Sequence, residues 1–279
     1  MKDNKLGADQ VEKFARDGVL VIRAFYDATA IEAVQRGIYD VIGRVLARHR
    51  LAIERQPFSC ASFDDGFNAM ITVNRSFGAE VYDAIKQIPA FIRLLADEAH
   101  EDLVRQLRPG SFPAIAAGGY GIRIDNPNED KYRTFWHQEY PSQLRSLNGL
   151  VCWSPLVEIT PELGPVSFCL GSHREGALPV YDESEGDKRS GAYSLKLHNE
   201  QHFLDKYQVI SPLSSPSDLV LIDFLTLHAS GYNRGVRSRW TMQFRYFDFN
   251  ESTGSAHGWK GSYASGVDFK SVHPELFID

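Results

Sequence analysis

Cysteine is scarce in this chain, which carries only Cys60, Cys152 and Cys169 among its 279 residues. A small secreted domain held together by disulfides usually has more cysteines, in even number. The chain also lacks an apolar run of the roughly 20 residues that a membrane-spanning helix needs. Its first six residues lack the apolar core of a signal peptide. These absences predict a cytoplasmic protein.

An excess of basic residues is absent as well. The chain has 30 Lys and Arg against 36 Asp and Glu, a formal net charge of −6. Such a balance gives no general attraction to nucleic acid or to an anionic membrane. The composition, 43% hydrophobic and 24% charged, is that of an ordinary globular protein. We therefore expect a small-molecule partner, and the sequence contains no pattern that sets an oligomeric state.

The N-terminal part of the chain has apolar residues at helical spacing. This spacing predicts a short helix over residues 9–16 and a long helix from 27 to about 49. It also predicts a helical region over 78–107, which Pro89 breaks or kinks. A strand is expected over 19–25 and a loop over 56–68.

From residue 115 onward the apolar runs become short and β-rich, with Gly, Pro, Asn or Ser between them. This punctuation is typical of an antiparallel sandwich or barrel. We predict one domain over 1–279, mainly β with α: a helical part (1–110), a core (115–250) and a tail (251–279). The core would be a double-stranded β-helix (a cupin-like jelly roll) braced by the N-terminal helices. The predicted strands are 119–125, 134–140, 147–157, 164–170, 207–211, 218–224 and 239–249.

An imidazole and a carboxylate stand two residues apart at His137 and Glu139. On an extended strand both side chains project to the same face, so both can reach one metal ion. A third ligand is needed, and the best candidate is His228, at the end of the apolar run before Ser230. Two histidines and a carboxylate on one face of a metal form the facial triad of non-haem Fe(II) oxygenases. We predict that these three residues are catalytic metal ligands.

An arginine follows His228 at a sequence spacing that bears on function. Arg239 lies eleven positions after His228 (239 − 228 = 11), on the strand expected after a turn. The odd positions of this strand are polar and the even ones are apolar or aromatic, and a polar inward face is costly unless it binds something. Arg239 and Thr241 are therefore predicted to hold a dicarboxylate cosubstrate, because a fixed guanidinium binds a carboxylate by a bidentate pair. Arg245, farther along this face, is expected to pair with a structural carboxylate instead.

These motifs resemble the phytanoyl-CoA dioxygenase family of Fe(II)- and 2-oxoglutarate-dependent oxygenases. The resemblance covers nearly the whole chain: residues 9–23 resemble the family's first helix and strand, and residues 164–173 its Gly-rich strand and Gly-Ser-His turn. His228, Ser230 and Arg239 match the distal half of the site. Glu139 stands where the family usually has Asp. The resemblance implies Fe(II) as the metal, with 2-oxoglutarate and dioxygen as cosubstrates.

Further site residues are expected around this centre. The resemblance places Ser230 and Trp153 beside the cosubstrate, and Arg123 is a further candidate for contact with cosubstrate or substrate. A polar segment over 181–203 is either a surface loop or a lid over the barrel, and the resemblance favours the lid. Polar residues after the metal motif are the candidates for binding substrate: Tyr140, Gln143, Arg145 and Asn148.

This polar set favours hydroxylation of a small polar substrate, and the resemblance extends to family members that modify sugars or surface-glycan precursors. Three alternatives stay open. One is a hydroxylase of an acyl-CoA-like or other small metabolite, and another is a cupin-type isomerase or epimerase that uses the triad without 2-oxoglutarate. The third is a non-catalytic jelly roll that binds metal. Arg239 and Thr241 argue against the third, because a structural metal needs no carboxylate clamp.

Overall fold

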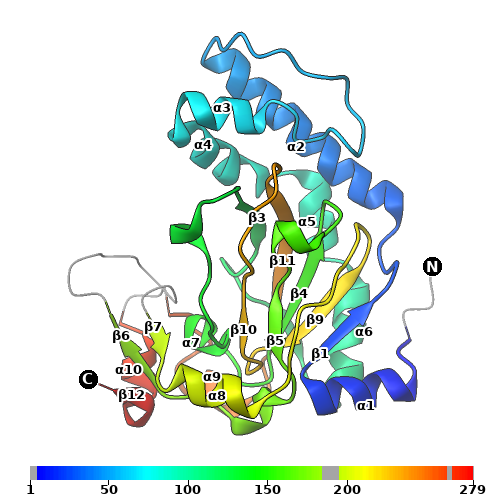
Figure 1. The fold of residues 1–279 in the computed structure, drawn as a ribbon. Coiled ribbons are helices and arrows are strands. Elements are labelled where there is room, and N and C mark those ends of the chain that lie inside the picture. Colours follow the sequence, from blue (N-terminus) through cyan, green and yellow to red (C-terminus); the bar gives the residue numbers. More distant parts are fainter. Residues whose placement is uncertain (1–4, 184–194, 263–265, 279) are drawn as a thin grey trace.

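The computed structural model describes residues 5–183, 195–262 and 266–278. In Figure 1 the N-terminal helices gather on one side of a central sheet, and the C-terminal segment lies at the opposite end from α2. None of the helices in the described part of the chain is both long and apolar enough to cross a membrane. The first helical layer consists of α1 (Ala8–Asp17), α2 (Ala28–Arg48), α3 (Phe67–Val73), α4 (Arg75–Ile85), α5 (Pro89–Leu95) and α6 (Glu98–Leu107).

The long helix α2 forms where the sequence predicts it. Its apolar residues recur every three or four positions, and Ile31, Val34, Ile38 and Ile42 are at most 2% exposed. The region 78–107 is divided at the proline as expected, because Pro89 opens α5. Helix α3 is an addition to the prediction, since the sequence there was expected to be loop up to residue 68.

The main sheet has six strands in the order β1-β9-β4-β11-β2, with β3 also paired to β11. All of its neighbours are antiparallel. The ten-residue β11 is central, because it pairs with β4 on one side and with β2 and β3 on the other. The strands are β1 (Val19–Ile22), β2 (Pro113–Ile115), β3 (Gly121–Asp125), β4 (Leu150–Pro155), β9 (Leu219–Asp223) and β11 (Arg239–Asp248).

One face of β11 packs on the helices. Trp240 contacts Phe67 of α3 edge-on, with ring centroids 4.8 Å apart, and Phe244 lies 5.4 Å from Phe91 of α5. Farther along, the Tyr246 hydroxyl donates a hydrogen bond of 2.6 Å to the Leu95 carbonyl. The apolar alternate positions therefore form the helix–sheet core, as their period predicts, and the polar positions face the other way.

The second layer is a smaller antiparallel sheet in the order β10-β5-β8. Residues near it (Val166 and His228) and residues of the main sheet (Trp153 and Arg245) line one cavity, so the cavity lies between the two layers. This arrangement, together with the solved structures described below, confirms the predicted jelly-roll core. The strands are β5 (Ser167–Cys169), β8 (Val209–Ile210) and β10 (His228–Ala229).

A third sheet brings the C-terminal segment against the middle of the chain. Strand β12 pairs in parallel with β6, which pairs with β7. The segment 181–203, expected as a loop or lid, begins in β6 and ends in α8, and its part 184–194 lies outside the described residues. The elements are β6 (Val180–Asp182), β7 (Leu195–Leu197), α8 (Glu200–Lys206), α9 (Ser252–Ala256), α10 (Phe269–Val272) and β12 (Phe277–Ile278).

Candidate active site

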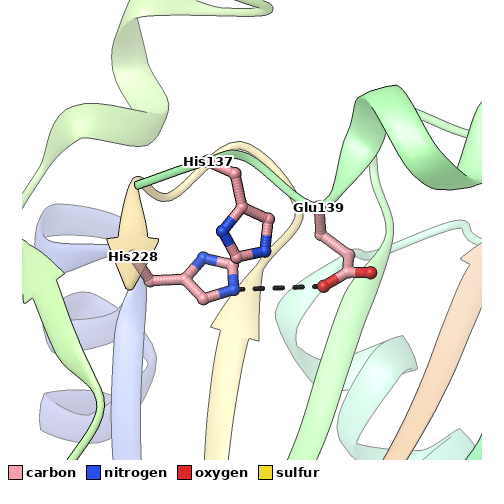
Figure 2. A group of neighbouring side chains, drawn as sticks. All are labelled: His137, Glu139 and His228. Carbon is pink, nitrogen blue, oxygen red and sulfur yellow. Dashed lines mark ion pairs between the residues drawn. The ribbon is translucent and has the colours of Figure 1, made fainter. Parts of the chain in front are cut away.

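Two histidines from distant parts of the chain are joined through their backbones. The His137 N–H donates to the His228 carbonyl, and the His228 N–H donates to the His137 carbonyl, each over 3.1 Å. This reciprocal pair is an isolated antiparallel bridge, and it sets the two imidazole rings 4.2 Å apart between centroids. Figure 2 shows both rings on the same side of the backbone, with Glu139 beside them.

Backbone carbonyls fix the protonation of both rings. Nδ1 of His137 lies 2.8 Å from the Phe135 carbonyl, and Nδ1 of His228 lies 2.8 Å from the Thr226 carbonyl. A carbonyl only accepts, so each Nδ1 carries the proton and each Nε2 keeps its lone pair. Burial lowers the pKa of both imidazoles, that of His228 to about 3, and so favours the neutral form that binds metals.

Glu139 reaches the same place by a different backbone path from the one predicted. The stretch 134–140 is not a strand, because Glu139 has helical torsions (φ −70°, ψ −31°) and caps the short helix α7 (Tyr140–Gln143). The prediction of an extended His-x-Glu pair was therefore wrong about the backbone, although the two side chains do converge. Oε2 of Glu139 lies 3.9 Å from Nε2 of His228 (Figure 2).

The three side chains form a set that fits a divalent metal. One ligand atom from each of His137, Glu139 and His228 lies within 4.8 Å of the other two. Burial alone would raise the pKa of Glu139, but the Arg245 guanidinium, together with the two histidines, outweighs burial and lowers the pKa to about 2. Two neutral imidazoles and one ionised carboxylate are the donors of a facial triad.

A second cluster of charges lies along the strands β3 and β11. Arg239, only 1% exposed, donates from Nη2 to Oδ2 of Asp125 over 2.9 Å. The two residues are direct partners in the β3–β11 ladder, and Arg123 binds the same carboxylate. Burial acts to raise the pKa of Asp125, but Arg123 and Arg239 outweigh it and lower the pKa to about 2.

Next to this cluster Thr241 has an unused polar atom. Its Oγ1 is buried and has no hydrogen-bond partner among the described residues. A buried hydroxyl without a partner costs free energy unless a ligand satisfies it. Arg239 and Thr241 point from the same face of β11, but only the Arg239 guanidinium lines the cavity, while Thr241 is 1% exposed.

A cavity of about 230 Å³ connects the metal triad with the charged cluster of Arg239 and Asp125, and Thr241 does not line it. Its wall includes His137, Glu139, His228, Arg239 and Asp125. The metal triad and the guanidinium of the predicted clamp thus border one space.

A sequence profile of the family named Phytanoyl-CoA dioxygenase (PhyH) matches residues 14–241, which is most of the chain. The chain belongs to the phytanoyl-CoA dioxygenase family. A curated relative, the ectoine dioxygenase of Sphingopyxis alaskensis, is 22% identical over 250 residues, covering 83% of this chain and 72% of the relative.

Solved structures with low sequence identity to this chain share its fold. The EctD structure from S. alaskensis with bound Fe has a TM-score of 0.58 at 18% identity, covering 89% of this chain and 79% of EctD. The epimerase SnoN in complex with Fe³⁺, alpha ketoglutarate and nogalamycin RO has a TM-score of 0.56 at 17% identity, covering 93% of this chain and 91% of SnoN. Enzymes of the phytanoyl-CoA dioxygenase family use Fe(II) as cofactor and 2-oxoglutarate as cosubstrate.

Within this family framework the structure brings several predicted residues together. Ser230, Trp153, Arg123 and Gln143 line the cavity with the triad. Arg123 is already engaged, since it donates to Asp125 and to the Tyr132 carbonyl. It is therefore a partner of the Asp125 cluster as well as part of the wall.

Three of the residues predicted to bind substrate do not line the cavity. Tyr140 is fully buried, and its hydroxyl lies 2.8 Å from Nε2 of His273 in the C-terminal segment. Arg145 donates to the Ala117 carbonyl, and Asn148 donates to Asp248. We therefore assign these three residues to support of the surrounding loops and keep only Gln143 at the cavity.

Two residues of the wall were missed or misjudged from sequence. Asp125 was not singled out, although its spacing of two from Arg123 on a strand places both on one face. Arg245 was expected to pair with a structural carboxylate, but its partner is the metal-ligand candidate Glu139, with Nε 2.8 Å from Oε1.

Proposed function

We propose that this protein is an Fe(II)- and 2-oxoglutarate-dependent hydroxylase of a small polar molecule, such as a sugar or a surface-glycan precursor. The observation that carries the proposal is the convergence of His137, Glu139 and His228 with both Nε2 lone pairs free. Iron bound there would activate dioxygen, with 2-oxoglutarate as the two-electron co-reductant that leaves as succinate and carbon dioxide.

The chain's own residues bind and orient in this scheme. His137, Glu139 and His228 would hold the metal, and the cavity beside them would admit the cosubstrate and dioxygen. Arg239 and Thr241 hold the distal carboxylate of 2-oxoglutarate, and Asp125 fixes the orientation of the Arg239 guanidinium. Glu139, His228 and Arg239 are each at most 7% exposed, which limits the access of bulk water to this side of the site.

The substrate class follows from the polar groups that are still available. Each guanidinium group on the cavity wall contacts a carboxylate: Arg123 and Arg239 share Asp125, and Arg245 contacts Glu139. The one positive charge left over is the charge that the distal carboxylate of 2-oxoglutarate would meet at Arg239. By contrast, the side-chain hydroxyls of Thr134, Ser230 and Tyr120 make no hydrogen bond to another residue of the described chain. Hydroxyls both donate and accept, so this wall suits a neutral, hydroxyl-bearing molecule. The ectoine dioxygenase relative, named for a small polar molecule, supports the same size class.

The test is turnover by the purified protein. Fe(II), 2-oxoglutarate and oxygen should give succinate, and a panel of free sugars, nucleotide sugars, amino-acid derivatives and acyl-CoA thioesters should show which class accelerates it. A product heavier by one oxygen atom identifies hydroxylation. The His228→Ala variant serves as the control for adventitious iron chemistry.

The same assay separates the alternatives. Acceleration by acyl-CoA thioesters alone would replace the polar substrate with an acyl one. Conversion of a substrate without succinate release would identify an isomerase or epimerase that does not use 2-oxoglutarate. Metal binding without succinate release under any condition would leave a non-catalytic jelly roll.

A further inference from the structure

The carboxylate of Glu139 is held by a guanidinium from a distant part of the chain. Arg245 lies on β11, 106 residues from Glu139, and both side chains are shielded from solvent, at 16% and 6% exposure. Its Nε donates to Oε1 over 2.8 Å, whereas its Nη2 lies 3.4 Å from Oε2. Two further N–H groups of Arg245 donate to the Gly119 carbonyl at 3.2 Å and to the Gln243 side-chain oxygen at 2.9 Å. Arg245 is therefore fixed in place before it contacts Glu139.

The two oxygens of this carboxylate have different surroundings. Besides Arg245, Oε1 accepts from the Gln143 amide at 3.3 Å. The Ser142 hydroxyl lies 3.2 Å from Oε1, but it shares its single proton with a shorter bond of 2.8 Å to the Glu139 backbone carbonyl. Oε2, in contrast, faces Nε2 of His228 at 3.9 Å. Oε1 thus accepts from Arg245 and Gln143 and shares the proton of Ser142, whereas Oε2 is directed at the imidazole of His228.

We propose that Arg245, assisted by Ser142 and Gln143, is a positioning residue that makes Glu139 a one-oxygen metal ligand through Oε2. This inference rests on the proposed function and adds how its carboxylate ligand is oriented. A glutamate side chain has three rotatable bonds, and fixing them when a metal binds costs free energy. Hydrogen bonds that already hold the carboxylate in place before the metal binds reduce this cost. With Oε1 held by these contacts, only Oε2 would be available to a metal, which would leave room there for the cosubstrate.

A competing role for Arg245 would be to hold Glu139 away from the metal. The geometry argues against it, because the three ligand atoms already lie within 4.8 Å of one another while the Arg245 contact to Oε1 is intact. The short contact is to the oxygen that faces away from His228, so metal binding through Oε2 breaks only the longer contact at 3.4 Å.

The two roles predict opposite effects on metal affinity, measured by anaerobic titration with Mn(II) or Co(II) followed calorimetrically. If Arg245 positions Glu139, Arg245→Leu should weaken metal binding about 10- to 100-fold, the range typical for loss of a group that orients a ligand. Arg245→Lys keeps the charge but not the planar fork, so its metal affinity should lie between those of the wild type and Arg245→Leu. Arg237→Leu is the matched control, because Arg237 lies just before the same strand and pairs with Asp64 instead. Unchanged or tighter metal binding by Arg245→Leu would overturn the inference.

Two further variants keep the test decisive. Ser142→Ala and Gln143→Leu each remove one donor to Oε1 and should each weaken metal binding about threefold, even if Arg245→Leu does not fold. If neither variant changes the affinity, the inference fails. The Glu139→Ala variant distinguishes failure of this inference from failure of the proposed function. If Glu139→Ala weakens metal binding but the Arg245, Ser142 and Gln143 variants do not, only the positioning role fails. If Glu139→Ala leaves the metal affinity unchanged, Glu139 is not a metal ligand and the proposed triad fails as well.

Discussion

Replacing Arg239 with alanine removes the guanidinium of the cosubstrate clamp and leaves the metal ligands untouched. Arg239 is 1% exposed, so water does not replace it as a partner for the 2-oxoglutarate carboxylate. Losing one member of a buried charge pair typically costs about 2–5 kcal/mol. Here Nε and Nη2 already bind Asp125, which leaves only part of the fork for the cosubstrate. We therefore expect the lower half of that range, about 2–3 kcal/mol, or roughly 30- to 150-fold in affinity.

The assay is anaerobic titration of the metal-loaded protein with 2-oxoglutarate. Arg239→Lys should lie between the wild type and Arg239→Ala, because lysine keeps the charge without the bidentate fork. Arg237→Ala is the control: Arg237 lies two residues away on the same parity, and its partner is Asp64. Both alanine variants should keep their metal affinity.

The clamp assignment would be refuted by a small effect. A change below about threefold for Arg239→Ala, or ~0.7 kcal/mol, would move the clamp to another guanidinium such as Arg123. A thermal unfolding midpoint close to that of the wild type excludes a folding defect, which is expected because Asp125 keeps Arg123 as a partner.

Three other predictions concern the metal, pH and packing. His228→Ala should lose stoichiometric metal binding and succinate formation, and retained iron with normal turnover would contradict the triad. Burial lowers the pKa of His100 from 6.5 to about 4, so the unfolded chain binds this proton first as the pH falls. The free energy of unfolding should then decrease by about 3 kcal/mol as the pH falls from above 6.5, the His100 pKa in the unfolded chain, to about 4. Urea unfolding of His100→Phe at the same pH values should lack this decrease. Parallel pH profiles for both proteins would refute it. Gly149→Ala would place a methyl group 2.1 Å from the buried Phe224 ring, and calorimetry should show a loss of about 1–3 kcal/mol.

Local patterns in the sequence predicted the parts of the fold that depend on one segment at a time. The apolar stripe of α2 and the alternation along β11 both reflect burial on one side of a regular element, so their period is visible without the structure. The spacing between His228 and Arg239 is also local, since only a short connection separates β10 from β11.

Contacts that depend on strand register could not be predicted from local sequence patterns. Arg239 meets Asp125 because β3 and β11 pair with these residues directly opposite, and no local pattern fixes that register. The Arg245–Glu139 pair joins a strand to the cap of a four-residue helix across 106 residues. The stretch 134–140 carried a local signal against a strand, however, because Pro141 directly after it is favourable in the first turn of a helix.

The two-sided character of β11 limits how this protein can change during evolution. Its alternate residues serve the helix–sheet core through Trp240 and Phe244, and the cavity through Arg239 and Arg245. Deleting one residue within the strand would exchange the two faces for the rest of its length, which would turn guanidinium groups toward the helices and aromatic rings toward the metal. Each unpaired buried charge would cost several kcal/mol, a large part of the stability of a typical domain. Changes in this strand are therefore confined to substitution, and changes of length are expected only in the connecting segments around it.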